Sequence, residues 1–290
     1  MSLEIENISY IYGQGTPEEH VALKEVSFTI PENSFVGLVG HTGSGKSTIV
    51  QLMNGLLQPS KGRVLVDGIN IAEKNNAARQ KKQEVGLVFQ YPEYQLFEET
   101  IGKDIAFGPK NQGCSEEEQI ERVKEAMALV EMDYDTWKDR SPFELSGGQK
   151  RRVAIAGVIA MKPRYLILDE PTAGLDPLGR DHILEAIARL HKKSKMSIIL
   201  VSHSMDDVAQ YAEHVIAMNQ GEKILDGTTE EVFSHGDLLE DIHLGVPSAL
   251  KLLMALRANG LDVEAKALTV EDAYQEILAA VKRKREVDSC

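Results

Sequence analysis

The sequence is poor in cysteine, and this scarcity limits what the protein can be. Only Cys114 and Cys290 occur among 290 residues, which excludes a disulfide-stapled scaffold. Basic residues are also in deficit: 32 Lys+Arg against 45 Asp+Glu give a net charge of −13, the opposite of the basic footprint that nucleic-acid binding usually requires. No apolar run approaches the roughly 20 residues of a membrane-spanning helix, and the first residues lack the features of a signal peptide. We therefore expect a soluble, intracellular protein with reduced thiols.

Hydrophobic residues make up 42% of the chain, enough for a sizeable core, and their spacing predicts alternating strands and helices. Expected strands are residues 3–9, 22–30, 35–39, 63–66, 85–89, 165–168 and 197–201. Expected helices are residues 47–57, a helix capped by Ser115 and Glu118, and residues 148–161, 178–191 and 205–211. This alternation predicts an α/β fold with a mainly parallel sheet covered on both faces, and the first strands indicate a smaller antiparallel β layer.

The character of the sequence changes after about residue 230. Three short helices are expected here: one capped by Thr228 and Glu231, one over residues 248–259, and one capped by Thr269 and Asp272. The last helix has an apolar face and ends in the basic run 282–285, which suits a helix C-terminus. We expect a main domain of residues 1–232 and a helical appendage of residues 233–290, too small to bury a core without packing on the main domain or on a partner.

A phosphate-binding loop is the strongest motif in the chain. Residues 40–47 read GHTGSGKS and match G-x-x-x-x-G-K-[ST], between an apolar strand and a helical pattern. Glycines let successive backbone N–H groups point into one concavity, and the next helix adds its positive N-terminus. Lys46 can reach the β- and γ-phosphates, and the Ser47 hydroxyl can coordinate Mg²⁺. We predict a nucleoside triphosphate site formed by Gly40, His41, Thr42, Gly43, Ser44, Gly45, Lys46, Ser47 and Thr48.

Two carboxylates end the expected strand at residues 165–168. Asp169 is a candidate Mg²⁺ ligand, and Glu170 would point toward the γ-phosphate and polarise an attacking water. Many strands end in acidic residues for solubility, so this pattern gains its meaning from the phosphate loop. His203 follows another buried strand; a histidine there is usually structural, but beside a triphosphate it could bind the γ-phosphate and orient the water.

A second anion site is indicated by Leu145, Ser146, Gly147, Gly148 and Gln149, which precede a basic stretch and a helix. Ser146 and the glycines expose N–H groups at that helix's N-terminus. Two anion sites for one triphosphate are redundant within one chain. Shared between two chains, each could close on the nucleotide bound by the other.

These five residues resemble the signature of ATP-binding cassette (ABC) ATPases, and the order of the other motifs agrees from residue 3 to about 230. The resemblance implies a P-loop NTPase cassette with a RecA-like, mainly parallel sheet, an antiparallel β layer and a helical signature subdomain at about residues 92–162. It implies ATP and Mg²⁺ as ligands, with Ser47, Gln90 and Asp169 at the metal and Lys46, Glu170 and His203 as catalytic residues. Asp176 would join the signature residues in contacting the partner's nucleotide. Tyr12 would stack on adenine, unless it is merely a strand-surface tyrosine.

The chain also resembles, more narrowly, the energy-coupling factor (ECF) transporter ATPases, specifically the second of the paired subunits. Residues 15–19, 40–45, 89–100 and 141–144 and the helical tail carry this likeness. It implies a partner ATPase, in a heterodimer rather than a homodimer, a membrane-embedded T component docking near residues 90–100, and substrate-binding S components for vitamins or metal ions. The protein would then lie peripherally on the cytoplasmic face of the membrane. ATP binding would close the cassette pair, and hydrolysis would reopen it and drive import.

Several alternatives stay open at this stage. Residues 91–99, with three aromatics and three acidic residues, form either a docking groove or a solvated loop. The last helix pairs with the partner's tail or lies on its own domain, and residues 282–285 contact anionic lipid or only complement the helix dipole. Alternative functions are the ATPase of another ABC transporter, a soluble ABC ATPase, and a nucleotide-gated scaffold without turnover, which Glu170 and His203 disfavour.

Overall fold

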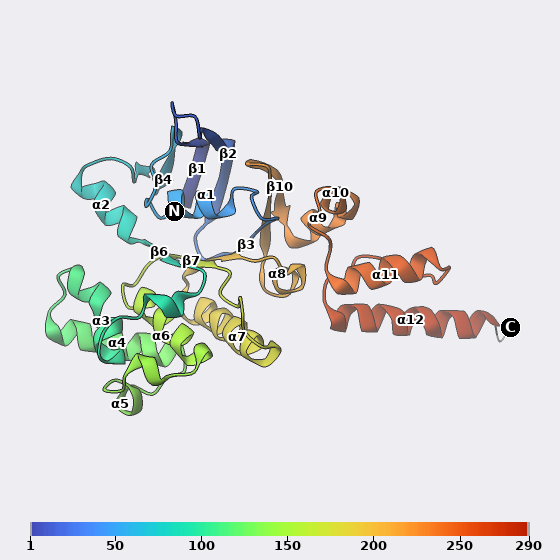
Figure 1. Ribbon diagram of the computed structural model, residues 1–290. Coiled ribbons are helices and arrows are strands. Elements are labelled where there is room, and N and C mark those ends of the chain that lie inside the picture. Colours follow the sequence, from blue (N-terminus) through green and yellow to red (C-terminus); the bar gives the residue numbers. More distant parts are fainter. Residues whose placement is uncertain (1, 289–290) are drawn as a thin grey trace.

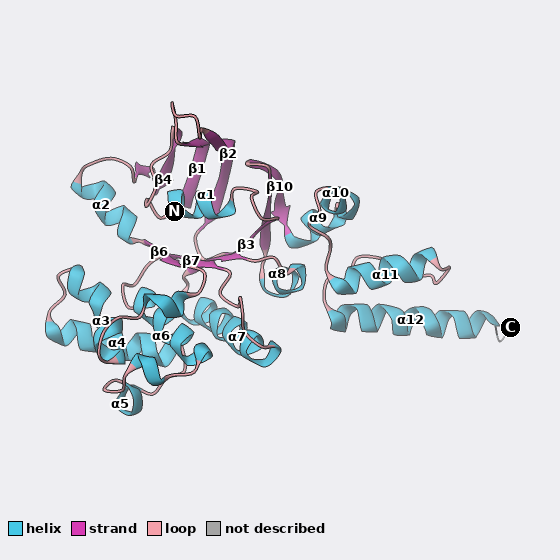
Figure 2. Ribbon diagram, viewed as in Figure 1, coloured by secondary structure: helices cyan, strands magenta, loops and turns pink. Residues whose placement is uncertain are grey.

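A computed structural model describes residues 2–288, with side chains through residue 283, so that Cys290 lies outside the described residues. Figures 1 and 2 show two β-sheets, helices beneath and beside them, and a helical arm at the C-terminal end. The strands are β1 (Ser2–Tyr12), β2 (His20–Pro31), β3 (Phe35–Gly40), β4 (Lys61–Val66), β5 (Ile69–Asn70), β6 (Val85–Val88), β7 (Tyr165–Asp169), β8 (Ser197–Val201), β9 (His214–Asn219) and β10 (Glu222–Thr228). The helices are α1 (Lys46–Met53), α2 (Asn76–Gln83), α3 (Ile101–Asn111), α4 (Glu116–Leu129), α5 (Tyr134–Trp137), α6 (Gly147–Ile159), α7 (Pro177–Ser194), α8 (Met205–Tyr211), α9 (Thr229–Ser234), α10 (Gly236–Asp241), α11 (Ser248–Ala258) and α12 (Val270–Asp288), with short 3₁₀ turns at Pro92–Gln95 and Pro142–Glu144.

The larger sheet carries the motif-bearing strands. Its order is β10-β9-β3-β8-β7-β6, and all neighbours are parallel except the edge pair β9–β10. The smaller sheet, β2-β1-β4-β5, is antiparallel, with Leu3 of β1 opposite both Ile30 and Val66. Both the predicted mainly parallel sheet and the predicted antiparallel layer are confirmed. In the parallel sheet, the strand ends that follow β3, β7 and β8 meet at one edge, which brings the predicted site residues together.

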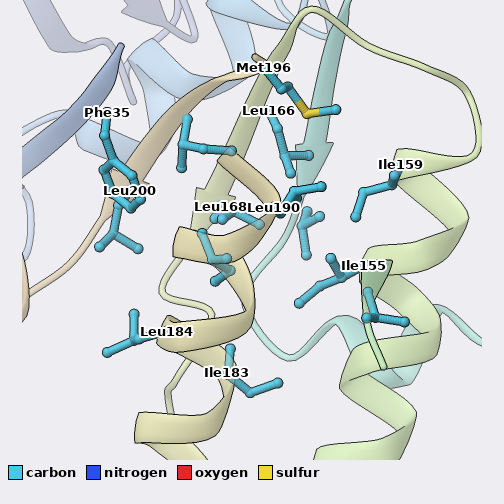
Figure 3. Packing of buried hydrophobic residues seen from close by; sticks show 14 of the residues in the cluster. Phe35, Ile155, Ile159, Leu166, Leu168, Ile183, Leu184, Leu190, Met196 and Leu200 are labelled. Atoms are coloured by element: carbon cyan, nitrogen blue, oxygen red, sulfur yellow. The ribbon is translucent and has the colours of Figure 1, made fainter. Parts of the chain in front are cut away.

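Alternation along the strands divides the core into two layers. On β3, Phe35 and Val39 join one buried cluster, whereas Val36 and Leu38 join the other, because successive side chains point to opposite faces. The first cluster contains α3, α4, α6 and α7, and Figure 3 shows Leu166 and Leu168 packed toward helical residues such as Ile155. The second lies between the parallel sheet, α1 and the antiparallel sheet.

Several elements differ from the sequence expectation. The helix expected over residues 47–57 is α1, which stops at Met53 because Gly55, two residues later, takes a left-handed conformation with φ +73°. Strands β9 and β10 and helices α2 and α3 were not expected. The helix predicted from its cap at Ser115 is confirmed as α4, in which the Ser115 hydroxyl accepts a hydrogen bond from the N–H of Glu118. The proposed limits of the signature subdomain and of the appendage stay predictions.

The C-terminal helices pack in two ways. Phe233, Leu239 and Leu250 of α9, α10 and α11 belong to the main core cluster, whereas α11 and α12 form a small cluster of their own. Figure 1 shows these last two helices side by side, extending away from the two sheets. The expected single apolar face of α12 is split: Ala273 and Ala280 are buried, but Val270, Tyr274 and Leu278 are 79%, 56% and 36% exposed.

The basic run that ends the last helix lies partly outside the described side chains. Lys282 is exposed, and Arg283 donates a hydrogen bond to the carbonyl of Asp262, 2.9 Å away. The side chains of Lys284 and Arg285 fall in the part that the structure does not describe. Among residues 2–288, no helix combines the length and the apolar character needed to cross a bilayer.

Candidate nucleotide-binding and hydrolysis site

The loop between β3 and α1 is tightly enclosed by its own chain. Gly45 has φ +101°, and a Cβ there would lie 2.7 Å from Leu23 Cδ2. A Cβ on Gly40 would lie 2.3 Å from Ser44 Oγ. The position of Gly45 therefore requires glycine for both conformation and space, and that of Gly40 requires it for space. The loop predicted from its sequence pattern has the strand before it and the helix after it that phosphate binding demands.

Lys46 lies inside this loop. It is 6% exposed, and its Nζ donates hydrogen bonds to the carbonyls of Gly40 at 2.5 Å and His41 at 3.0 Å. Burial lowers the pKa of Lys46 from its ordinary value, although the nearby carboxylates of Glu170 and Asp169 act in the opposite direction. A buried ammonium held by carbonyl groups can turn to an anion that enters the loop.

Two further features fit the loop to a triphosphate. Within the described chain, no side chain caps α1, so its first N–H groups remain available to an anion. The buried Ser44 hydroxyl has no hydrogen-bond partner among the described residues. A buried polar group without a partner is costly, and a phosphate oxygen would satisfy it. The residues present therefore fit the predicted ligand.

The carboxylates predicted for hydrolysis stand at the end of β7. Burial raises the pKa of Asp169, and the neighbouring Glu170 carboxylate raises it further. Glu170 itself has φ +49°, an uncommon backbone conformation for a residue other than glycine. Its N–H donates to the carbonyl of Val201 on β8 at 3.0 Å, which fixes the turn after the strand.

Gln90 and His203 meet at Glu170, although the three residues come from three different strand ends. Gln90 Nε2 donates to one carboxylate oxygen of Glu170 at 3.1 Å, and His203 Nε2 contacts the other. His203 is exposed, so it faces the open side of the site rather than the core. The structure thus gathers the predicted catalytic residues around the phosphate loop, which their separation in sequence could only suggest.

The proposed Mg²⁺ ligands, Ser47, Gln90 and Asp169, supply a hydroxyl, an amide oxygen and one carboxylate. Among residues 2–288, no group of three His, Cys, Asp or Glu residues is placed to bind a metal. Mg²⁺ binds nucleotide sites through few protein ligands together with phosphate oxygens and water. The donor set therefore fits Mg²⁺ that arrives with a nucleotide.

Tyr12 lies next to the phosphate loop, at the end of β1. Its hydroxyl is 3.3 Å from the Thr48 hydroxyl of α1, and its ring makes an edge contact with Tyr10 at 4.8 Å. The ring is 40% exposed, which leaves it accessible to a base. Its role in stacking on adenine stays a prediction.

The predicted signature residues form the start of α6. Ser146 Oγ accepts from the N–H of Gln149, and Gln149 Oε1 accepts from the N–H of Ser146 at 3.0 Å, a reciprocal capping box. A Cβ on Gly147 or Gly148 would meet nothing within 4 Å. The first turn of α6 therefore faces open space.

This second element does not complete the first within one chain. Figure 1 shows α1 and α6 on opposite sides of the parallel sheet. Asp176 caps α7, with its carboxylate accepting from the N–H of Gly179 at 2.7 Å. The two helix starts therefore belong to helices that pack on opposite faces of this sheet.

Sequence reasoning missed a buried ion pair beside the site. Arg151, within the basic stretch that follows the signature, is 1% exposed and binds Glu93 through both carboxylate oxygens. It also donates to the carbonyls of Pro171 and Ala173, both at 2.9 Å. Of the three acidic residues in segment 91–99, Glu93 thus has its carboxylate paired inside the chain. Only the adjacency of three basic residues to the signature hinted at such a role.

Comparisons with known proteins show the family of the chain. A family model described as ABC transporter matches residues 23–173. The chain is 55% identical to the energy-coupling factor transporter ATP-binding protein EcfA2 of Clostridium perfringens, over 97% of this chain and 99% of that one. It is 56% identical to the protein of the same name from Clostridioides difficile, over 97% and 98%.

Solved structures show the same fold. The structure of cbiO1 from Clostridium perfringens, part of the ABC transporter complex cbiONQ, matches with a TM-score of 0.72 and 37% identity, over 83% of this chain and 94% of that one. A dimeric ATP-binding cassette in a post-hydrolysis state, bound to ADP and Pi, matches with a TM-score of 0.68 and 28% identity, over 79% and 99%.

Proposed function

The chain belongs to the ABC transporter family, in the branch of energy-coupling factor ATP-binding proteins, and we propose that it is the ATP-hydrolysing subunit of a membrane import complex for vitamins or metal ions. One observation carries this proposal: Gln90, Glu170 and His203 converge in contact at the mouth of a phosphate loop that holds a buried lysine. The family supplies the reaction, and this arrangement supplies residues able to perform it.

Each residue has a distinct part in hydrolysis. Lys46 and the N–H groups of α1 bind the phosphates, and Glu170 accepts a proton from the attacking water. His203 and Gln90 already contact the Glu170 carboxylate. They orient that water, and they change position according to whether the terminal phosphate is bound. Mg²⁺, when bound with ATP near Ser47, Gln90 and Asp169, neutralises charge that develops on the phosphates.

The second part of the proposal is that the catalytic unit contains two cassettes. The open first turn of α6 would bind the γ-phosphate of the nucleotide held by the other chain, with Asp176 lining the same junction. ATP then favours the closed pair because it contacts both chains, and loss of the γ-phosphate removes this preference. The dimeric state of the ADP-bound cassette that matches this fold supports the arrangement.

The transporter partners are a further part of the proposal. The second cassette would be a related ATPase subunit, forming a heterodimer, and the exposed Val270, Tyr274 and Leu278 of α12 suit pairing with its tail. An S component that binds the solute would complete the complex.

A groove suited to the membrane-embedded T component borders residues 90–100. It has a volume of ≈ 610 Å³ and lies between α2, α3, α6 and the segment that follows Gln90. Phe97 and Phe107 line it with an edge-to-face contact of 4.9 Å, and both are exposed. An apolar groove beside the acidic Glu98 and Glu99 suits an incoming amphipathic helix that carries arginine. This contact would hold the chain peripherally at the cytoplasmic face, where ATP is available.

The experiment is to purify the complex from membranes and to measure hydrolysis and ATP binding with Glu170→Gln. Loss of the general base should lower turnover by about 100-fold or more, with ATP affinity retained, since the loop that binds phosphate is untouched. Glu117→Gln, on the exposed first turn of α4, is the matched control and should behave as wild type. Turnover near that of wild type in Glu170→Gln, or a chain recovered without membrane subunits, would contradict the proposal.

A further inference from the structure

Helix α8 occupies an unusual place between the hydrolysis site and the C-terminal helices. Its N-cap is Ser204, whose Oγ accepts from the N–H of Asp207 at 3.2 Å, and the residue before Ser204 is His203. The helix also lies directly on β3, since a Cβ on Gly37 would be 2.5 Å from Val208 Cγ1. A shift of α8 would therefore displace both the loop that carries His203 and β3, the strand that leads into the phosphate loop.

Asp207 connects α8 to α7. It is 6% exposed, and Arg180 Nε donates to both of its oxygens at 3.1 Å, while Arg180 Nη2 donates to Oδ1 at 2.5 Å. The same Nη2 reaches the hydroxyl of Ser204. The backbone N–H of Arg180 donates to the carbonyl of Asp176 at 2.9 Å. The Arg180 guanidinium thus binds the Ser204–Asp207 end of α8, while the backbone of the same residue belongs to the first turn of α7, which Asp176 caps.

The adjacent carboxylate, Asp206, points to a different element. Its Oδ1 accepts from the N–H of Ser248 at 2.7 Å, and its Oδ2 accepts from the Ser248 hydroxyl at 2.8 Å. Ser248 is the first residue of α11, and the N-cap position before it is Pro247, which offers no side-chain cap. Asp206 therefore caps α11 from another helix, a role that a residue of the same segment normally fills.

We propose that α8 couples the C-terminal helices to ATP hydrolysis: Asp206 holds the start of α11, and Asp207 positions the His203 and Asp176 loops through Ser204 and Arg180. This inference rests on the proposed function, since it assumes that those loops act on ATP. Asp206 and Asp207 are positioning residues, because neither reaches the phosphate loop itself. A partner subunit that binds α11 and α12 would then change the rate of ATP hydrolysis without contacting the nucleotide.

The alternative is that the two aspartates only stabilise local helix ends, and kinetics separate the two ideas. In the complete complex, Asp206→Ala should lower kcat about fivefold and Asp207→Asn about tenfold or more, with the KM for ATP within about twofold of wild type, because misplaced loops slow the chemical step rather than binding. Asp206→Asn keeps an acceptor for the Ser248 N–H and should recover most of the lost kcat. Combining Asp206→Ala with Ser248→Ala should be no worse than Asp206→Ala alone, since both remove one link.

Asp133→Ala provides the matched control. Asp133 caps α5 in the helical region, where its carboxylate accepts from the N–H of Thr136 at 2.9 Å. Its loss should lower thermal stability as a cap does, but leave kcat unchanged. Unchanged kcat in Asp206→Ala, an equal fall in Asp133→Ala, or additive effects of Asp206→Ala and Ser248→Ala would overturn the inference. Glu170→Gln in the same assay separates the two proposals. If Glu170→Gln retains turnover, the proposed function is wrong. If Glu170→Gln loses turnover but Asp206→Ala keeps the wild-type kcat, only the proposed coupling through α8 is wrong.

Discussion

The two glycine-flanked helix starts in this chain, α1 and α6, are built in opposite ways. At α1 the N-cap is Gly45, and within residues 2–288 no side chain caps the helix. At α6 the Ser146 and Gln149 side chains satisfy each other's backbone N–H groups. The first start is crowded, since a Cβ on Gly45 would lie 2.7 Å from a neighbour, whereas the second faces open space.

This difference indicates how each helix start meets an anion. Among the described residues, the α1 loop has an uncapped helix start, a buried hydroxyl without a partner and a buried lysine, all of which a bound phosphate would satisfy. At the start of α6, the capping box already satisfies the backbone N–H groups of Ser146 and Gln149 within the single chain. We therefore expect α1 to bind ATP without help and α6 to act only on a nucleotide presented by a second cassette.

The strongest way to break this comparison is Lys46→Ala. Removing the only buried ammonium of the described loop should weaken ATP binding by about 100-fold or more, because the triphosphate loses a desolvated charge-assisted contact. ATP-dependent pairing of cassettes should disappear with it. Calorimetric titration with ATP measures the first effect, and sedimentation measures the second.

The exposed Lys74→Ala is the control for Lys46→Ala, since it removes the same charge from the surface next to α2. Its ATP affinity should match that of wild type. Retained affinity in Lys46→Ala would mean that the α1 loop is not the primary anion site, and the contrast between the two helix starts would lose its basis.

A smaller effect is expected from Gly147→Val. An added Cβ meets nothing within 4 Å in the chain itself, so the fold and the ATP affinity should be preserved within about twofold. It would cover the first turn of α6, and hydrolysis should fall roughly 100-fold because the second anion site can no longer approach the γ-phosphate. Steady-state turnover beside a single-chain ATP titration tests this.

Gly45→Val should have the opposite effect to Gly147→Val, because it changes the crowded start of α1. There φ is +101°, and the side chain would collide with Leu23 and the carbonyl of Ala22, so folding and ATP binding should both suffer. Equal losses of ATP affinity in the two glycine variants would show that both helix starts serve the nucleotide of their own chain.

The same contrast explains what the sequence could predict. The phosphate loop was recognisable because strand, glycines, lysine and helix are contiguous, and each has a local physical role. The helix capped by Ser115 and the strand ending at Asp169 were equally local signals, and both are present. The contacts of Glu170 with Gln90 and His203 were not predicted, although parallel strand ends share one edge of the sheet.

The missed features depend on contacts distant in sequence or on weak local patterns. Helix α2 buries only Ala78, so it has no apolar periodicity, and α3 contains Pro109 and two glycines. The burial of Arg151 depends on Glu93, 58 residues away. The split apolar surface of α12 depends on its packing against α11, and no periodicity along one helix reveals which side a neighbour covers.

The smallest expected effect separates the two helix starts by pH. Burial lowers the pKa of Lys46, so this lysine loses its proton at lower pH than an exposed lysine does. ATP binds the protonated form better, and the γ-phosphate is already ionised above about pH 7. ATP affinity should therefore fall as pH rises through the lowered pKa, by about threefold to tenfold per pH unit above it. The signature residues of α6 contain no titratable side chain, so pairing measured at saturating ATP should stay constant over the same range.

Lys46→Arg is the control for this titration, because a guanidinium stays charged throughout and should flatten the pH dependence of whatever ATP affinity remains. ATP titrations between about pH 7 and 10 distinguish the cases, since an ordinary lysine titrates near 10.4. A wild-type affinity that is constant over this interval would mean that Lys46 is not the group that senses the phosphates. A slope that persists in Lys46→Arg would assign the titration to another residue, and pairing that falls with the same slope at saturating ATP would place a titratable group at the α6 contact as well.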